Sequence, residues 1–434
     1  MTSNEVGSAG ADFVGFSFEK GELVSRVFST ADTNMVALFQ RLGPGIMRIG
    51  GSSVDDILWT PGGKGRTGHE IATIDIDQFA AFVAATRWRV IYGINLAKNT
   101  ESAAAEEAAY VARKLGSNLY CFELGNEPAA YDISPHPVPT GYKAWNYTTF
   151  MARWISLRNE ILQKVPGATF SGADATGGSY TTYTLPFAQD AGQLKLLSQH
   201  YYRLGDKDTR TMAALLTPDP KLAPLLAAVK GAADGIRTPF RITETNSATG
   251  GGILDVSDAY GSALWALDFI FTAAKGGASG VHFHGGEGET NGYYTPFTFP
   301  NSTLFEIRPL FYALTFSKKV GQGSVVDASI NAGGKSISVY AIRTGAGTSV
   351  MFVNKEVNES FKVDLKLPAQ ATSATAIQMT GPGLLSKSGI QIQGATISVE
   401  TGLGPMDADY SIPVSGQNAS VYVPALTAVL VTVR

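Results

Sequence analysis

Two glutamates, Glu127 and Glu244, have the residue type and the sequence context needed for paired acid–base and nucleophilic catalysis. Glu127 lies in the segment LGNEPAA, and Glu244 lies in the segment RITETNS. Two carboxyl groups can divide the hydrolysis of an acetal between them: one donates a proton to the leaving oxygen, and the other attacks carbon or activates water. A single glutamate at a strand end is more often a cap or an ion-pair partner. The prediction of catalysis therefore depends on the Asn-Glu-Pro context of the first glutamate and on the presence of the second.

Eight short apolar runs are the elements that must position these carboxyl groups. The runs are rich in β-branched and aromatic residues and are bounded by glycine or polar clusters, which is typical of buried strands. They cover residues 13–18, 46–50, 89–96, 119–125, 168–175, 194–202, 240–246 and 280–285.

Helical patterns lie between the predicted strands. The segment 102–116 is rich in alanine, with glutamate early, lysine and arginine late, and glycine at its end, as capping and dipole preferences favour. Similar apolar spacing predicts helices over 150–165, 260–277 and 305–321. Strands that alternate with helices eight times predict an α/β fold, a (β/α)8 barrel over residues 13–320. In that fold functional groups lie at the carboxyl ends of the strands, where Glu127 follows the fourth strand and Glu244 ends the seventh.

The character of the sequence changes near residue 321. Seven or eight short strand-like segments follow without a helix between them, separated by turn sequences such as NAGG (331–334) and TGAG (344–347). This spacing predicts a C-terminal β-sandwich domain over 321–434. The polar leader, residues 1–12, could pack with it.

The composition argues against several classes of partner. The chain has 434 residues, a net charge of −3 and no run of like charges, so we expect no nucleic-acid or membrane partner. We also expect a monomer. One cysteine, Cys121, excludes an intramolecular disulfide, and the five histidines show no metal-binding spacing, so no metal is predicted. No signal peptide is visible. We expect a secreted or periplasmic protein whose leader has been removed, and a cytoplasmic location stays open.

Four segments together resemble glycoside hydrolase family 79, the heparanase-like β-glucuronidases of the clan of retaining (β/α)8 glycosidases. The second and third segments are specific in combination, and together the four span the predicted barrel. They are MRIGGSSVDD (47–56), CFELGNEPAAY (121–131), RITETNSATGGG (241–252) followed by SDAYGSALWALD (257–268), and NGYYTP (291–296).

The resemblance implies that Glu127 is the acid/base, that Glu244 is the nucleophile and that no cofactor is needed. It further implies that Asn126 binds the sugar 2-hydroxyl and that Tyr201 holds Glu244 ionised and correctly oriented. His200, beside Tyr201, is expected to line the cleft.

Further sugar contacts follow from the same resemblance. Glu19 and Ser52 are expected to bind ring hydroxyls. Apart from the resemblance, the glycines around Gly250 would allow close approach of the backbone to substrate, and they could equally form a plain turn. His284 stands where heparanases carry an amide side chain, so this corner of the site departs from the family.

The uronate carboxylate is expected to meet a glycine and a tyrosine after the eighth strand. Gly292 is the glycine, and Tyr293 or Tyr294 is the tyrosine, since two adjacent tyrosines leave the alignment open by one residue.

The resemblance implies a retaining β-glucuronidase, and we expect endo-hydrolysis of a glycan such as heparan sulfate, with Lys64 and Arg66 facing sulfates. Exo-release of terminal glucuronate is the alternative. Two less favoured alternatives are a glycosidase that acts on a neutral sugar and a carbohydrate-binding protein without activity.

Overall fold

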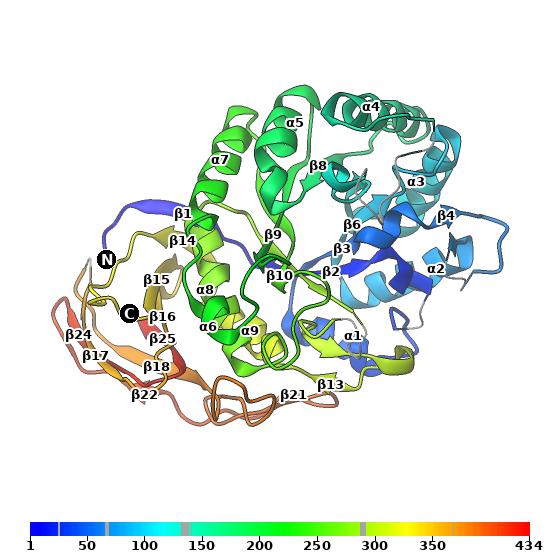
Figure 1. Cartoon of the computed structure of the whole chain (residues 1–434). Coiled ribbons are helices and arrows are strands. Elements are labelled where there is room, and N and C mark those ends of the chain that lie inside the picture. The colour runs from blue at the N-terminus through cyan, green and yellow to red at the C-terminus, as the bar shows by residue number, and fades with distance from the viewer. Residues whose placement is uncertain (25–26, 66–68, 132–138, 140, 287–291, 368) are drawn as a thin grey trace.

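The computed structural model describes residues 1–434 except 25–26, 66–68, 132–138, 140, 287–291 and 368. Two parts lie side by side in Figure 1: a barrel surrounded by helices, and a β-rich domain that contains the C-terminus. Among the described residues, no helix is long and apolar enough to cross a membrane.

Eight parallel strands close into a barrel, which confirms the predicted fold. Each predicted apolar run overlaps one of these strands, and three of the strands continue one or two residues beyond the run. The runs are apolar because strands of such a barrel are buried on both faces. In chain order the strands are β2 (Val14–Glu19), β3 (Ile46–Gly50), β6 (Arg89–Ile94), β7 (Leu119–Leu124), β8 (Phe170–Ala175), β9 (Leu196–Leu204), β10 (Phe240–Ala248) and β11 (Val281–Gly285).

Helices surround the barrel between consecutive strands. Three of the four predicted helices match within a few residues, but the fourth starts later than predicted, at Pro309. Residues 306–307 instead form a strand, β13 (Glu306–Ile307), that pairs with β12 (Phe297–Thr298), and Pro309 is well suited to the first turn of a helix. The helices are α1 (Thr33–Leu42), α2 (Thr73–Thr86), α3 (Glu101–Leu115), α4 (Tyr147–Lys164), α5 (Leu185–Asp190), α6 (Met212–Leu216), α7 (Leu222–Gly235), α8 (Tyr260–Lys275) and α9 (Pro309–Lys318).

The second part contains a large antiparallel sheet, a small one, and a two-stranded pair of β20 (Ile397–Ser398) and β21 (Gly402–Leu403). The order of strands in the large sheet is β1 (Glu5–Ala9), β14 (Gly323–Val326), β15 (Ile337–Thr344), β16 (Gly347–Asn354), β25 (Thr427–Val433), β18 (Ala374–Thr380) and β19 (Gln391–Ile392), with β22 (Tyr410–Ser411) also paired to β18. The small sheet contains β17 (Phe361–Lys366), β24 (Asn418–Val423) and β23 (Val414–Ser415). The first strand of the chain, β1, therefore belongs to the large sheet, where it pairs with β14.

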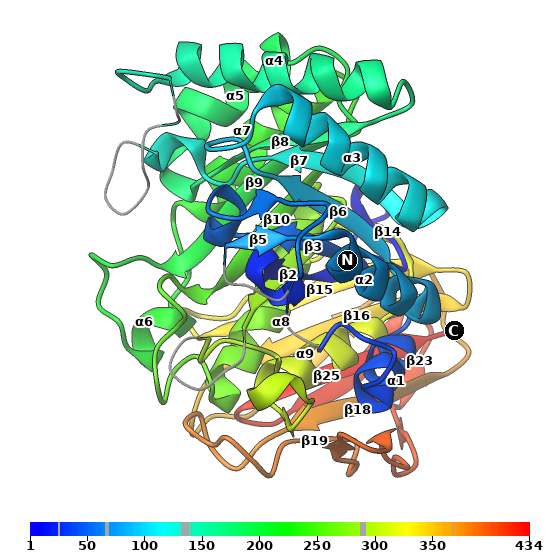
Figure 2. The same cartoon turned by 90° about the vertical axis from the view of Figure 1, so that its right-hand side faces the viewer.

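The large sheet is buried on both faces because its side chains alternate between two cores. Val350 and Phe352 pack with the core of the β-rich domain, whereas Met351 and Val353 pack with the core that continues into the barrel. In Figure 2 the large sheet lies beside α8 and α9, the helices that it contacts. At this interface Tyr340 donates a hydrogen bond to Asp268 of α8 at 2.6 Å. The second domain thus covers the helices that follow the seventh and eighth barrel strands.

Candidate active site

A cleft of about 960 Å³ lies at the carboxyl ends of the barrel strands. This is where the functional residues of such barrels are found. Eight of the predicted site residues line it: Glu19, Ser52, Glu127, Tyr201, Glu244, Gly250, His284 and Tyr294.

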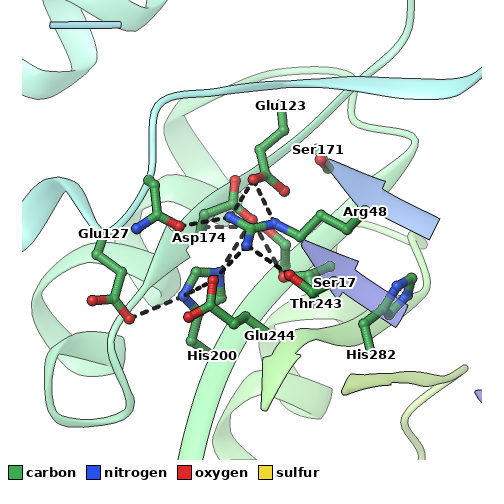
Figure 3. A network of polar contacts seen from close by, with 12 residues as sticks. Ser17, Arg48, Glu123, Glu127, Ser171, Asp174, His200, Thr243, Glu244 and His282 are labelled. Carbon is green, nitrogen blue, oxygen red and sulfur yellow. Dashed lines mark hydrogen bonds and ion pairs between the residues drawn. The ribbon is translucent and has the colours of Figure 1, made fainter. Parts of the chain in front are cut away.

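Glu127 is placed by a tight turn that follows β7. Its backbone is left-handed, with φ at 47°, and its N–H donates to the carbonyl of Asp174 at 2.9 Å. Pro128 then begins a short 3-10 helix, for which its fixed φ is suited. A carboxylate oxygen of Glu127 lies 3.0 Å from Nδ1 of His200, which is a residue of β9 (Figure 3). The Asn-Glu-Pro sequence therefore produces a strained turn that directs the glutamate into the cleft.

Glu244 lies on β10 and is held through both of its oxygens. Arg48 Nη1 donates to Oε2 at 2.5 Å, and the hydroxyl of Tyr202 donates to Oε1 at 2.9 Å. Burial alone would raise the pKa of Glu244. Interactions with His284, His200 and Arg48, together with the hydrogen bond from the tyrosine hydroxyl, outweigh burial and place the pKa below its ordinary value. Glu244 is therefore ionised, as a nucleophile requires.

The two catalytic candidates lie close together. One oxygen of Glu127, one of Glu244 and a ring nitrogen of His200 are all within 4.8 Å of one another. Carboxyl groups about 5–5.5 Å apart are typical of retaining glycosidases, whereas inverting enzymes need a wider gap for water. The same three residues could offer ligands to a metal ion, but Arg48 already pairs with Glu244 and its charge opposes a cation there.

A buried polar network lies beneath the cleft, and the sequence analysis did not identify three of its members, Arg48, Glu123 and Asp174. Arg48, in the middle of β3, contacts Glu123 and Glu244 (Figure 3). It also donates to the side-chain oxygen of Asn126 at 2.7 Å. Asp174 lies at the end of β8 in the same network. A charged residue inside a predicted apolar strand was the available signal for each of these residues.

The prediction that Tyr201 holds Glu244 is wrong, because Tyr202 does so. Tyr201 lines the cleft, but its hydroxyl donates to Asp219 at 2.9 Å and its ring stacks on Phe269. Successive side chains of a strand point to opposite faces, so His200 and Tyr202 share the face that carries the catalytic pair. His200 is fully buried beneath the cleft and contacts Glu127.

Glu19 ends β2 and is fixed by the loop that follows β3. It accepts hydrogen bonds from the backbone N–H groups of Ser52 and Ser53 and from the hydroxyl of Ser53. Nε2 of His284 lies 3.4 Å away. Burial would raise the pKa of Glu19, but His284 and then Ser53 lower it below its ordinary value, so Glu19 presents an ionised acceptor to the cleft.

His284 connects the Glu19 side of the cleft to the nucleophile. Its Nδ1 lies 2.9 Å from the hydroxyl of Ser17 and 3.8 Å from Glu244. Burial lowers the pKa of His284, but the charge of Glu244 and the hydrogen bond with Glu19 outweigh it, so the net shift is upward. His282 lies on the same strand away from the cleft and accepts from Arg241.

Of the two adjacent tyrosines, Tyr294 lines the catalytic cleft. Tyr293 lines a separate hollow together with Asp258 and Arg308. The N–H of Gly292, the glycine expected to meet the carboxylate, donates to the carbonyl of Gly251 at 3.1 Å. Gly250 and Gly251 line the cleft with φ of 66° and 83°, so the turn after β10 brings backbone to the cleft wall.

Sequence comparisons relate the chain to fungal β-glucuronidases at low identity. It is 23% identical to a β-glucuronidase of Aspergillus niger over 351 residues, which cover 72% of this chain and 62% of that protein. It is 24% identical to a β-glucuronidase of Neurospora crassa over 217 residues, which cover 45% of this chain and 39% of that protein. The chain thus matches less than two thirds of either relative, and no known protein-family profile matches it.

Structural comparisons show the fold. A 4-O-α-L-rhamnosyl-β-D-glucuronidase from Fusarium oxysporum, in complex with Rha-GlcA, superimposes with a TM-score of 0.84 at 20% identity and covers 100% of this chain and 98% of that one. A family 51 α-L-arabinofuranosidase from Bifidobacterium longum superimposes with a TM-score of 0.71 at 14% identity and covers 99% and 97%. The barrel followed by a β-rich domain is therefore an architecture that this chain shares with glycoside hydrolases.

Proposed function

We propose that this chain is a retaining β-glucuronidase. The observation that supports it most is the separation of at most 4.8 Å between a Glu127 oxygen and a Glu244 oxygen at the carboxyl ends of barrel strands. The similarity to β-glucuronidases supports the sugar class, and the structural similarity supports the architecture.

In the first step of the proposed reaction, Glu244 attacks the anomeric carbon and Glu127 donates a proton to the leaving oxygen. A covalent glycosyl-enzyme forms as the glycosidic bond breaks. In the second step Glu127 takes a proton from water, which attacks the anomeric carbon and releases Glu244. Arg48 and Tyr202 keep Glu244 ionised and fix the plane of its carboxylate, while His200 holds the Glu127 side chain beside it.

The part of the cleft around Tyr294 is the proposed site for the uronate. The phenol of Tyr294 and the backbone N–H groups of Gly250 and Gly251 offer neutral donors to a carboxylate. Glu19 and Ser52 line the same cleft and are the proposed partners for ring hydroxyls. Asn126, with its side-chain oxygen bonded to Arg48, is the proposed partner of the 2-hydroxyl.

The cleft also extends along the loops after β8 and β9, where the leaving group would lie beyond Glu127. The charges of the wall there balance, with Arg203 and Lys221 against Asp208 and Asp219. This balance favours an uncharged sugar as the leaving group over a sulfated one. Endo-hydrolysis of heparan sulfate, with Lys64 facing a sulfate, stays a prediction, and Arg66 lies outside the described residues.

A substrate panel tests the proposal. We expect release of chromophore from an aryl β-glucuronide at least tenfold faster than from the matching β-glucoside, because only the glucuronide has a carboxylate to meet Tyr294. Equal rates on both would contradict the uronate assignment. Size analysis of products from heparan sulfate separates the two modes: early fragments of middle size indicate endo-cleavage, and glucuronate release with little change in length indicates exo-cleavage.

A further inference from the structure

Three buried carboxyl groups surround a single guanidinium beneath the cleft. Glu123, Asp174 and Glu244 are only 0%, 1% and 7% exposed. Arg48 contacts Glu123 at 2.5 Å and Glu244 at 2.5 Å, and Asp174 lies close enough to act on its charge. The two imidazoles near Glu244 each also contact a further carboxylate, so three ionised carboxylates around this guanidinium would leave buried charge uncompensated, which is costly in a protein interior.

The contact between Glu123 and Asp174 shows where this excess charge can be removed. Oε2 of Glu123 is buried and finds no hydrogen-bond donor among the described residues. Figure 3 shows Asp174 and Glu123 on the same side of Arg48, and Glu123 raises the pKa of Asp174 both as a nearby charge and as a hydrogen-bond partner. An ionised carboxylate only accepts hydrogen bonds, so two of them in contact need a proton between them.

We propose that Asp174 is protonated and donates to Oε2 of Glu123, so that the pair carries one negative charge. Glu123 is the ionised member, because it accepts from both Nε and Nη2 of Arg48. The proton gives Oε2 of Glu123 its missing partner. The pKa of Asp174 is consistent with this: burial raises it, and the charge of Glu123 raises it further, against the opposing effect of Arg48.

Asp174 thereby becomes a positioning residue for both halves of the proposed active site. Because a neutral Asp174 does not compete for the charge of Arg48, the guanidinium can stabilise Glu244. Through its backbone it holds Glu127, whose N–H it accepts at 2.9 Å. Its Oδ1 lies 3.3 Å from the hydroxyl of Thr243 and 3.9 Å from Nε2 of His200, which contacts Glu127 through Nδ1. These catalytic consequences depend on the proposed function, but the shared proton does not.

Asparagine at position 174 is the conservative test of the shared proton. An asparagine is neutral, can donate to Glu123 through its amide, and tolerates the left-handed backbone that Asp174 has at φ 56°. We expect D174A to lower kcat/KM at least tenfold, because it leaves Glu123 without a donor. D174N should recover most of that loss. A well-folded D174N that is as inactive as D174A would show that an ionised carboxylate is required, which would overturn the proposal.

Infrared spectroscopy gives a readout that needs no substrate. The variant E127Q removes the carboxyl group of the proposed acid, and E127Q/D174N is compared with it at neutral pH. We expect the carbonyl band of a buried protonated carboxyl in E127Q, shifted in D2O and absent from E127Q/D174N. As a matched control, D409N changes an exposed carboxyl group and should leave the band unchanged.

A band unaffected by D174N, or no such band in E127Q, would overturn the proposal even if D174A does not fold. If the unmodified chain lacked glucuronidase activity but showed the band, the proposed function would fail while the shared proton stood.

Discussion

The hydroxyl groups of two adjacent tyrosines should contribute very differently to catalysis. In Y202F, Glu244 loses the donor to Oε1, and the carboxylate keeps only its contacts on Oε2. A hydrogen bond to a charged group contributes about 1.5–3 kcal/mol. If all of this free energy is lost from the stabilisation of the transition state, kcat/KM falls about 10- to 150-fold.

The matched control is Y201F, which removes a hydroxyl bonded to Asp219. We expect kcat/KM of Y201F to stay within about threefold of the unmodified protein, because neither catalytic glutamate loses a partner. The pH profile gives a second comparison. Tyr202 lowers the pKa of Glu244, so its loss raises that pKa and moves the acid limb of kcat/KM toward neutral pH, by about 1–2 pH units.

The assay is initial-rate hydrolysis of an aryl β-glucuronide across pH, with circular dichroism to check folding. A large loss in Y201F together with a normal Y202F would refute the assignment of the two faces of β9.

Three further predictions concern single side chains. E127A should hydrolyse a glucuronide with a poor leaving group at least about 100-fold more slowly, the lower end of the usual range for general acid catalysis, and azide should restore turnover of an activated aryl glucuronide as the glycosyl azide; no rescue would contradict its role. Y294F should raise KM for glucuronides while Y293F should not, and equal effects would contradict the cleft assignment of the pair. His284 should stabilise the fold most at low pH: because Glu244 and Glu19 raise its pKa, its contribution is fully present below about pH 6.5 and is lost as pH rises through the folded value. The melting-temperature gap between the unmodified protein and H284Q should therefore shrink from about pH 6 to about pH 9, and a constant gap would count against this.

Local patterns were sufficient to predict the barrel and to select Glu127 and Glu244, which lie close together in the cleft, as the candidate pair. Each barrel strand is a short apolar run, and the Asn-Glu-Pro motif places Glu127 on the turn after β7. The pairing of β1 with β14 could only be raised as a possibility, because nothing local specifies a partner more than 300 residues away.

The error at Tyr201 came from neglecting the alternation of side chains along a strand. His200 and Tyr201 are neighbours on β9, so they cannot both face the catalytic pair, and Tyr202 was the residue in phase with His200. The polar network was detectable in principle, since Arg48 and Glu123 interrupt apolar strands. Which carboxyl meets which cation, however, depends on distances across the barrel that the sequence does not contain.

The most direct test of the central claim is the stereochemistry of the first product. Proton NMR during rapid hydrolysis of an aryl β-glucuronide reports which anomer of glucuronic acid is released before mutarotation. The separation between Glu127 and Glu244 predicts that the β-anomer appears first and the α-anomer follows only by mutarotation. Initial release of the α-anomer would contradict double displacement by this pair of glutamates.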